Sequence, residues 1–108
     1  ACLGLAYKAD VDDFRESPSI DVVKGLKNQY PGSVLACDPY CSTASIGGVE
    51  LVDLKNAVTD AEILVLLTDH KQFLKLSPLL LSGKIIIDPR GLWQHIRPTL
   101  NKVDTQAA

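Results

Sequence analysis

The sequence lacks the features that mark membrane, secreted or nucleic-acid-binding proteins. Its 108 residues hold no apolar run close to the roughly 20 residues that a helix needs to cross a bilayer. The first residues lack the basic start and the long apolar stretch of a signal peptide. The net charge of −2 gives no reason to expect nucleic acid or a membrane surface as a partner. We therefore expect a cytoplasmic protein with neither partner.

Cysteine is scarce and shows no framework spacing. Cys2, Cys37 and Cys41 are an odd number of thiols, which favours free thiols in a reducing compartment. Zinc usually takes four ligands at set spacings, and no second Cys or His pair accompanies Cys37 and Cys41. The stretch DVDD, 10–13, lacks the central glycine and the final glutamate of a calcium loop. The sequence therefore predicts no metal site.

Two further absences limit the chemistry. Gly4-Leu5-Ala6 does not supply the spaced glycines of G-x-G-x-x-G, so Asp38, which mimics a ribose-binding acid, is expected to be a turn residue. His70 and His95 have no evident Ser or Cys partner, so no catalytic triad is predicted. His70 also stands at a predicted helix start, where we expect a solvated side chain.

What the chain does have is enough length for one core and a regular alternation of elements. We predict strands over 2–6, 33–37, 50–52, 62–67 and 84–88, separated by helices over 18–29, 54–58 and 70–76, a loop over 39–49 and a short helical stretch from Ser77-Pro78. Strands alternating with helices are typical of a mostly parallel sheet with helices on both faces. The predicted fold is therefore α/β, a Rossmann-like three-layer sandwich over residues 1–99, followed by a flexible polar tail over 100–108.

Two segments carry the clearest patterns. Ser17 suits a helix N-cap and Pro18 suits the first helical position of 18–29. Its expected apolar stripe contains Ile20, Val22, Val23, Leu26 and Lys27. The run EILVLL, 62–67, is almost continuously apolar, as expected for a strand covered on both faces. Asp69 is expected to cap the helix that follows.

Cations gather where the predicted strands end. Ligands of open α/β sheets bind outside the carboxyl ends of the strands, and Lys8, Arg15 and Arg90 all follow strands, as donors suited to phosphate or carboxylate groups. Polar residues share this edge: Tyr7, Asp10, Asp12, Asp13, Asp38, Thr68, Asp69 and His70. The alternative is that the cations only pair with Asp10, Asp12, Asp13 and Asp88 to stabilise loops.

The stretch GLAYKADVDDFRESPSIDVVKGL, 4–26, resembles the opening of the C-terminal domain of the nucleotide-sugar 6-dehydrogenases. This family includes UDP-glucose, GDP-mannose and UDP-N-acetylmannosamine dehydrogenases. Its pattern of G-x-A-(F/Y)-K followed by D-x-R-E-S-P fits here, and Asp38-Pro39, LTDHKQF at 67–73 and DPRG at 88–91 agree in order. LTDHKQF is similar to the UDP-N-acetylmannosamine branch.

The resemblance implies an enzyme that oxidises the C6 alcohol of a UDP-sugar, with NAD as cofactor, for cell-surface polysaccharide precursors. It implies three parts, an NAD domain, a central dimerisation segment and a substrate-nucleotide domain, of which this chain resembles the third. The full protein would be a homodimer or larger. The family's nucleophilic cysteine and catalytic lysines lie in the other parts, so we name no catalytic residue here and expect the fragment alone to be inactive.

The resemblance also assigns binding residues. Tyr7 and Lys8 match positions that touch the substrate nucleotide, and Arg90 matches an arginine near the substrate. Arg15 matches an arginine that reaches across a cleft toward NAD, with Asp13 and Glu16 expected to orient Lys8 and Arg15. Two other functions stay open: a stand-alone flavodoxin-like regulatory domain such as a phosphorylation receiver, and an assembly domain without a ligand.

Overall fold

The computed structural model describes residues 1–94, and its centre is a parallel sheet. The four strands lie in the order β2-β1-β5-β6 and are β1 (Cys2–Leu3), β2 (Ala36–Cys37), β5 (Ile63–Leu66) and β6 (Ile85–Ile87). All three pairings are parallel, with Leu3 opposite both Cys37 and Leu66. The predicted tail and His95 lie outside the described residues.

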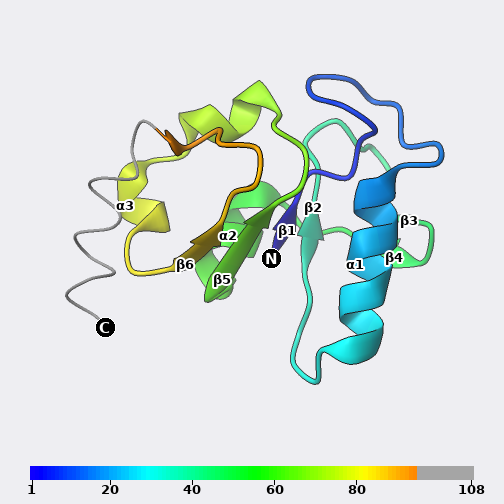
Figure 1. Cartoon of the computed structure of the whole chain (residues 1–108), viewed down its shortest axis with the longest axis horizontal. Helices are drawn as coiled ribbons and strands as arrows, with labels where there is room; N and C mark the ends of the chain where they lie inside the picture. Colours follow the sequence, from blue (N-terminus) through cyan, green and yellow to red (C-terminus); the bar gives the residue numbers. More distant parts are fainter. Residues whose placement is uncertain (95–108) are drawn as a thin grey trace.

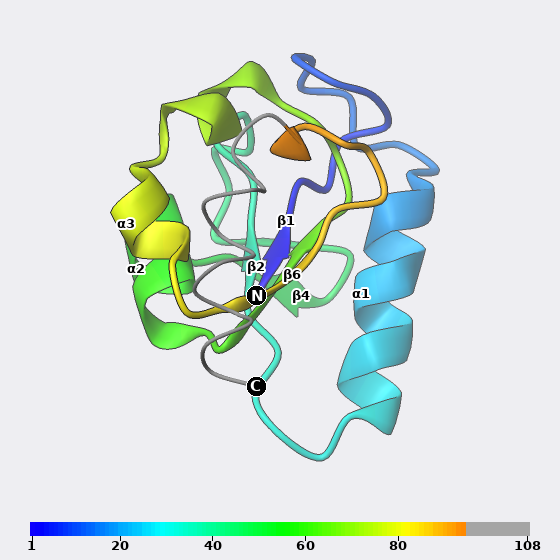
Figure 2. The ribbon, with the colours of Figure 1, turned by 60° about the vertical axis from the view of Figure 1, so that its left-hand side comes forward.

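Helices cover the two faces of this sheet. Figure 1 shows the strands in the middle of the molecule, with α1 (Pro18–Gln29) beside β2 and α3 (Pro78–Leu81) at the far side. In Figure 2, α1 lies on one side of the sheet, and α2 (Leu54–Asp60) lies with α3 on the other. The predicted α/β three-layer fold is confirmed. None of the described helices is long and apolar enough to cross a membrane.

Strand alternation divides the core into two clusters, because successive side chains point to opposite faces. Leu3, Leu64 and Leu66 pack with residues of α2 and α3 and with the buried rings of Phe73 and Trp93. On the other face, Cys2 and Ala36 pack against α1. A two-stranded hairpin, β3 (Ser45–Ile46) and β4 (Val49–Glu50), extends this second cluster through buried Val49.

The α1 face is covered only in part. Ile85 and Ile87 of β6 are 61% and 49% exposed, and Ile63 and Val65 of β5 are half-buried. The expectation that the strand over 62–67 is covered on both faces is therefore wrong for one face. The reason is topological: α1 follows β1 and packs through Ile20 and Val23 over β1 and β2, which leaves β5 and β6 beyond its reach.

All five predicted strands are shorter in the structure, and the loop predicted over 39–49 contains a further strand, β3, and the start of β4. The strand expected over 2–6 ends at Leu3 because Gly4 turns the chain with φ +95°. A Cβ on Gly4 would lie 2.5 Å from the Thr68 Cβ, so the two segments approach as closely as only glycine allows. The loop expected over 39–49 contains the hairpin, whose Gly47-Gly48 turn has positive φ at both residues, as tight hairpins prefer.

The helices show further differences. The helix over 18–29 is confirmed, but Val22 and Leu26 are exposed, so the buried stripe is narrower than predicted. The segment predicted as a helix over 70–76 is a 3-10 helix, η1 (Lys71–Lys75). Its N-cap residue is His70, whose own side chain makes no capping hydrogen bond, so the role predicted for Asp69 is wrong. Ser77 does start α3, where its Oγ accepts from the Leu79 amide at 3.3 Å.

Candidate functional site at the carboxyl edge of the sheet

The predicted site residues begin in the loop between β1 and α1. The Tyr7 amide donates to the Asp13 carbonyl at 2.7 Å, which closes residues 7–13 into a compact loop. The Arg15 guanidinium donates to both carboxylate oxygens of Asp13, at 3.1 and 3.3 Å. These hydrogen bonds lower the pKa of Asp13 and raise the pKa of Arg15. Asp13 therefore orients Arg15, as the sequence predicts.

Lys8 and Arg90 are exposed at the same edge of the sheet. Arg90 follows β6, and its Nε donates to the Leu67 carbonyl at 3.2 Å. The Leu67 amide in turn donates to the Leu3 carbonyl of β1, so Arg90 is anchored where β5 and β1 end. Tyr7 is 59% exposed beside Lys8 in the loop after β1. Among the contacts of residues 1–94, no hydrogen bond joins Lys8 to Arg90.

The carboxylates near these cations mainly accept hydrogen bonds from backbone amides. Asp88 accepts from the amides of Gly91, Leu92 and Trp93 at 2.8 to 3.2 Å. The Asp10 carboxylate accepts from the Lys71 amide at 2.7 Å. Over the described residues, the only ion pair between these cations and the nearby carboxylates is that of Arg15 with Asp13. Loop stabilisation by ion pairing therefore does not account for Lys8 and Arg90.

Beneath the loop lies a buried pair that the sequence analysis missed. The Nε2 of His70 lies 2.8 Å from Oδ2 of Asp38, and both side chains are fully buried. The Leu5 and Ala6 amides donate to the same Oδ2 at 2.7 and 3.1 Å, and the Tyr40 amide donates to Oδ1 at 2.8 Å. Burial acts to raise the pKa of Asp38, but the hydrogen bonds outweigh it and leave this pKa below its usual value.

Asp38 and His70 correct two predictions. Asp38 is not a simple turn residue, because it ties the end of β1 to the loop after β2. His70 is not solvated, because its ring is buried between Tyr40 and Phe73 at centroid distances of 4.6 and 5.6 Å. A signal was present in the sequence: Asp38 directly follows one predicted strand, His70 lies three residues after another, and both strands flank the first strand in a Rossmann-like order. Charged or polar side chains at such positions meet beneath the first loop.

Thr68 completes the support of the loop. Its Oγ1 donates to the Ala6 carbonyl at 2.9 Å and lies 3.3 Å from the Ser19 Oγ. Since the only hydroxyl proton of Thr68 goes to Ala6, Ser19 is the donor in the second hydrogen bond. The start of α1, the end of β1 and the end of β5 are thus joined through one threonine.

Comparison with known proteins identifies this arrangement. The family model described as "UDP-glucose/GDP-mannose dehydrogenase family, UDP binding domain" matches residues 1–95. The chain belongs to this family. The predicted resemblance to the C-terminal domain of nucleotide-sugar dehydrogenases is thereby confirmed, and the family match argues against a phosphorylation receiver.

Individual relatives of this UDP-binding domain are nucleotide-sugar dehydrogenases. The chain is 44% identical over 99 residues to an NDP-N-acetyl-D-galactosaminuronic acid dehydrogenase of Ralstonia nicotianae, covering 90% of the chain and 23% of the relative. It is 37% identical over 97 residues to a UDP-N-acetyl-D-mannosamine dehydrogenase of Yersinia pestis, covering 87% and 23%. The chain thus spans less than a quarter of the length of these relatives.

A solved structure agrees with these relatives. The UDP-N-acetyl-mannosamine dehydrogenase of Staphylococcus aureus superposes with a TM-score of 0.67 at 35% identity, over 84% of this chain and 22% of that one. The shared fold therefore lies within one part of a much longer enzyme.

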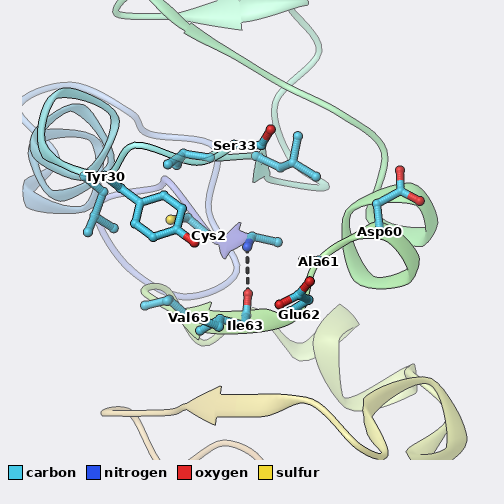
Figure 3. A pocket seen from close by; sticks show the side chains of 12 residues that line it. Cys2, Tyr30, Ser33, Asp60, Ala61, Glu62, Ile63 and Val65 are labelled. Carbon is cyan, nitrogen blue, oxygen red and sulfur yellow. Dashed lines mark hydrogen bonds between the residues drawn. The ribbon is translucent and has the colours of Figure 1, made fainter.

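Two hollows among the described residues of the UDP-binding domain lie at different ends of the strands. Figure 3 shows one of about 280 Å³ between Tyr30 and Ser33 on one side and Glu62 and Ile63 on the other, at the amino ends of β1 and β5. A second, of about 330 Å³, lies beside Asp38 and Cys41 after β2. Since parallel α/β sheets bind ligands at the carboxyl edge, we take the exposed cations, and not the hollow in Figure 3, as the candidate site.

This domain does not itself fit NAD. A dinucleotide site after β1 would need a glycine-rich turn open to the pyrophosphate and an acid free to bind ribose. Here Gly4 packs directly against Thr68. The Asp38 carboxylate is fully buried and already accepts hydrogen bonds from Leu5, Ala6, Tyr40 and His70, so it is not free to bind a ribose.

Proposed function

We propose that this domain binds the UDP portion of a UDP-N-acetylhexosamine, with UDP-N-acetylmannosamine as the favoured substrate. The complete protein is an NAD-dependent dehydrogenase that oxidises the C6 alcohol of this sugar to a carboxylate. Tyr7, Lys8 and Arg90 are the proposed substrate-binding residues. The observation that carries the proposal is the exposed pair of cations, Lys8 and Arg90, at the carboxyl edge of a domain of this family. The printed names of the relatives support the amino-sugar class.

The geometry suits a diphosphate. Arg90 uses its Nε on the Leu67 carbonyl, which holds the guanidinium plane and leaves both Nη groups to donate to phosphate oxygens as a fork. Lys8 supplies a compact point charge with three donors. The exposed ring of Tyr7 is available beside them for contact with the nucleoside.

The rest of the reaction belongs to other parts of the polypeptide. Most of the residues that bind NAD, and all of those that carry out the chemistry, lie outside this chain, so this segment alone has no activity. Arg15, held by Asp13, reaches from this domain toward the bound NAD. The complete protein works in the cytoplasm as a homodimer or larger assembly and supplies precursors of cell-surface polysaccharide.

An NMR titration of the chain with UDP, with GDP as the control nucleotide, tests this proposal. We expect saturable shifts at Tyr7, Lys8 and Arg90 for UDP and a weaker response to GDP. Lys8→Ala should weaken UDP binding by about 1.5–3 kcal/mol, the usual value of one charge-assisted hydrogen bond. Lys27→Ala, a change of an exposed lysine in the last turn of α1, is the matched control and should leave the affinity unchanged.

Two results would contradict the proposal. A flat response from well-folded protein would show that the domain does not bind UDP. Saturable shifts around the hollow in Figure 3, at the opposite edge of the sheet, would place a nucleotide site where the fold does not predict one.

A further inference from the structure

The contacts of His70 define which of its ring nitrogens carries the proton. The backbone amide of Asp10 lies 2.8 Å from Nδ1 of His70. An amide nitrogen can only donate, so Nδ1 must offer a lone pair. The proton then resides on Nε2, which donates to the Asp38 carboxylate at 2.8 Å. The imidazole is thus neutral in the Nε2–H form, with each nitrogen engaged by a different loop.

Two hydrogen bonds of Asp10 connect the loop after β1 to the segment that follows β5. Asp10 donates its amide to His70, and its carboxylate accepts from the amide of Lys71, the next residue. Asp10 has a φ of +61°, in the left-handed region that residues other than glycine adopt at a free-energy cost. Contacts on both sides of Asp10 offset that cost, so the loop is held in a shape that it would not keep by itself.

Packing and hydrogen bonds hold the His70 ring in one orientation. It packs between Tyr40 and Phe73, and its Nε2 is fixed by a carboxylate that itself holds the Leu5 and Ala6 amides. The loop is therefore supported at its start by Asp38 and near its middle by His70. Lys8 lies between these two supports, two residues before Asp10.

We propose that His70 is a positioning residue for the nucleotide site: its Nδ1 lone pair holds the Asp10 amide and thereby fixes the loop that presents Tyr7 and Lys8. The statement about what the loop binds rests on the proposed function, whereas the statement about how the loop is held does not. A role in packing alone would require only the ring's volume. A positioning role requires an acceptor at Nδ1.

Two matched substitutions separate these roles. His70→Asn places a side-chain oxygen near the position of Nδ1, so it keeps an acceptor for Asp10 and loses the donor to Asp38. His70→Gln places its amide near the position of Nε2, so it keeps a donor for Asp38 and loses the acceptor for Asp10. Both variants lose the aromatic ring. If only volume mattered, the larger Gln would be the better replacement.

The experiment combines NMR and binding on the full chain. In the wild type, ring ¹⁵N shifts should show Nδ1 unprotonated and Nε2 protonated, and the spectrum of His70→Asn separates the signals of His70 from those of His95. We expect His70→Gln to lose about tenfold in UDP affinity and to speed hydrogen exchange at the Asp10 amide by about tenfold or more, the loss of one hydrogen bond. His70→Asn should retain more of both. Urea unfolding of each variant measures stability separately.

The outcomes are distinct. A wild-type ring protonated at Nδ1, or equal losses of affinity and exchange protection in the two variants, overturns the role of His70. If the wild type shows the expected ring form and a protected Asp10 amide but no response to UDP, the loop connection stands and the nucleotide function fails.

Discussion

The two faces of the central sheet differ in how completely their apolar side chains are buried. On the face toward α2 and α3, Leu3, Leu64 and Leu66 are completely buried beneath helices and two large aromatic rings. On the face toward α1, burial is complete over β1 and β2 but stops at β5, and Ile85 and Ile87 of β6 are largely exposed. The closed face holds the fold together, and the open half is apolar surface that the rest of residues 1–94 leaves uncovered.

This difference matters for a chain that spans 22–23% of its relatives. Stability should depend on residues of the closed face and hardly at all on those of the open half. The carboxyl edge of the sheet differs from both faces, because buried hydrogen bonds rather than apolar contacts hold its loops in place. Measurements on each region test whether these three parts of the molecule differ in this way.

The largest expected effect concerns thiol reactivity on the closed face. Burial, together with the nearby carboxylates Asp38 and Asp53, raises the pKa of Cys37 from 9.0 to about 12. Because the thiolate is the reactive form, and a thiolate of higher pKa is also the stronger nucleophile, Cys37 should react with iodoacetamide at pH 8 about 50-fold more slowly than an ordinary thiol. Half-buried Cys41 in the loop after β2 is the internal reference. Mass spectrometry should show Cys41 modified first, and equal rates would mean that the closed face opens readily.

The second-largest effect is expected from shortening a side chain on the closed face. Leu66→Ala removes a fully buried side chain from the middle of the larger core cluster. Such changes cost about 2–5 kcal/mol through lost burial and a residual cavity. Urea denaturation followed by circular dichroism measures this loss. A cost below about 1 kcal/mol would show that this cluster does not support the fold.

The carboxyl edge should respond to acid. The folded-state pKa of Asp38 lies below its usual value, so its carboxylate stabilises the fold above about pH 4, and this contribution is lost as pH falls through the lowered pKa. Asp38→Asn would set an NH₂ group against one of the amides that now donate to the carboxylate, at a cost of about 1–3 kcal/mol at neutral pH. The variant should also lose less stability than the wild type between pH 5 and pH 3. Parallel pH profiles would refute this role for Asp38.

The smallest effect is expected on the open half of the sheet. Ile87→Ala removes an apolar side chain that is 49% exposed, so the free energy of unfolding should change by about 0.5 kcal/mol or less. This variant is the matched control for Leu66→Ala, because both sites lie in neighbouring strands of one sheet. Unfolding should be measured at two protein concentrations. If Ile87→Ala lowers the free energy of unfolding as much as Leu66→Ala does at both, the open half of the sheet is covered in solution.

The sequence predicted local features well and long-range contacts poorly. Pro18 and the spacing of Ile20 and Val23 were enough to predict α1, because both are local signals. Ser17 does occupy the N-cap position, but its Oγ makes no capping hydrogen bond, so the side-chain cap expected from its type is absent. The parallel sheet followed from the alternation of strands and helices. The open half of the sheet was not predictable, since EILVLL reads as fully buried whether or not a helix covers its second face.

The site divides in the same way. Lys8, Arg15 and Arg90 were placed at one edge because all three follow strands. Their roles as ligand-binding residues remain predictions. Asp38 and His70 were misjudged because they are 32 residues apart, and only the strand order brings them together. A polar residue judged alone looks solvated, and its partner becomes visible only when the neighbouring strands are aligned.

The exposed isoleucines lie on β6, which is an edge strand of the described sheet. A bare apolar edge is a template on which identical chains can stack and grow into aggregates. This strand is three residues long, its ladder ends at Asp88 and Pro89, and Asp88 is committed to the turn that follows. Proline and a short length both limit pairing with another strand. The exposed isoleucines therefore lie on a strand whose short length and following proline limit its pairing with another chain.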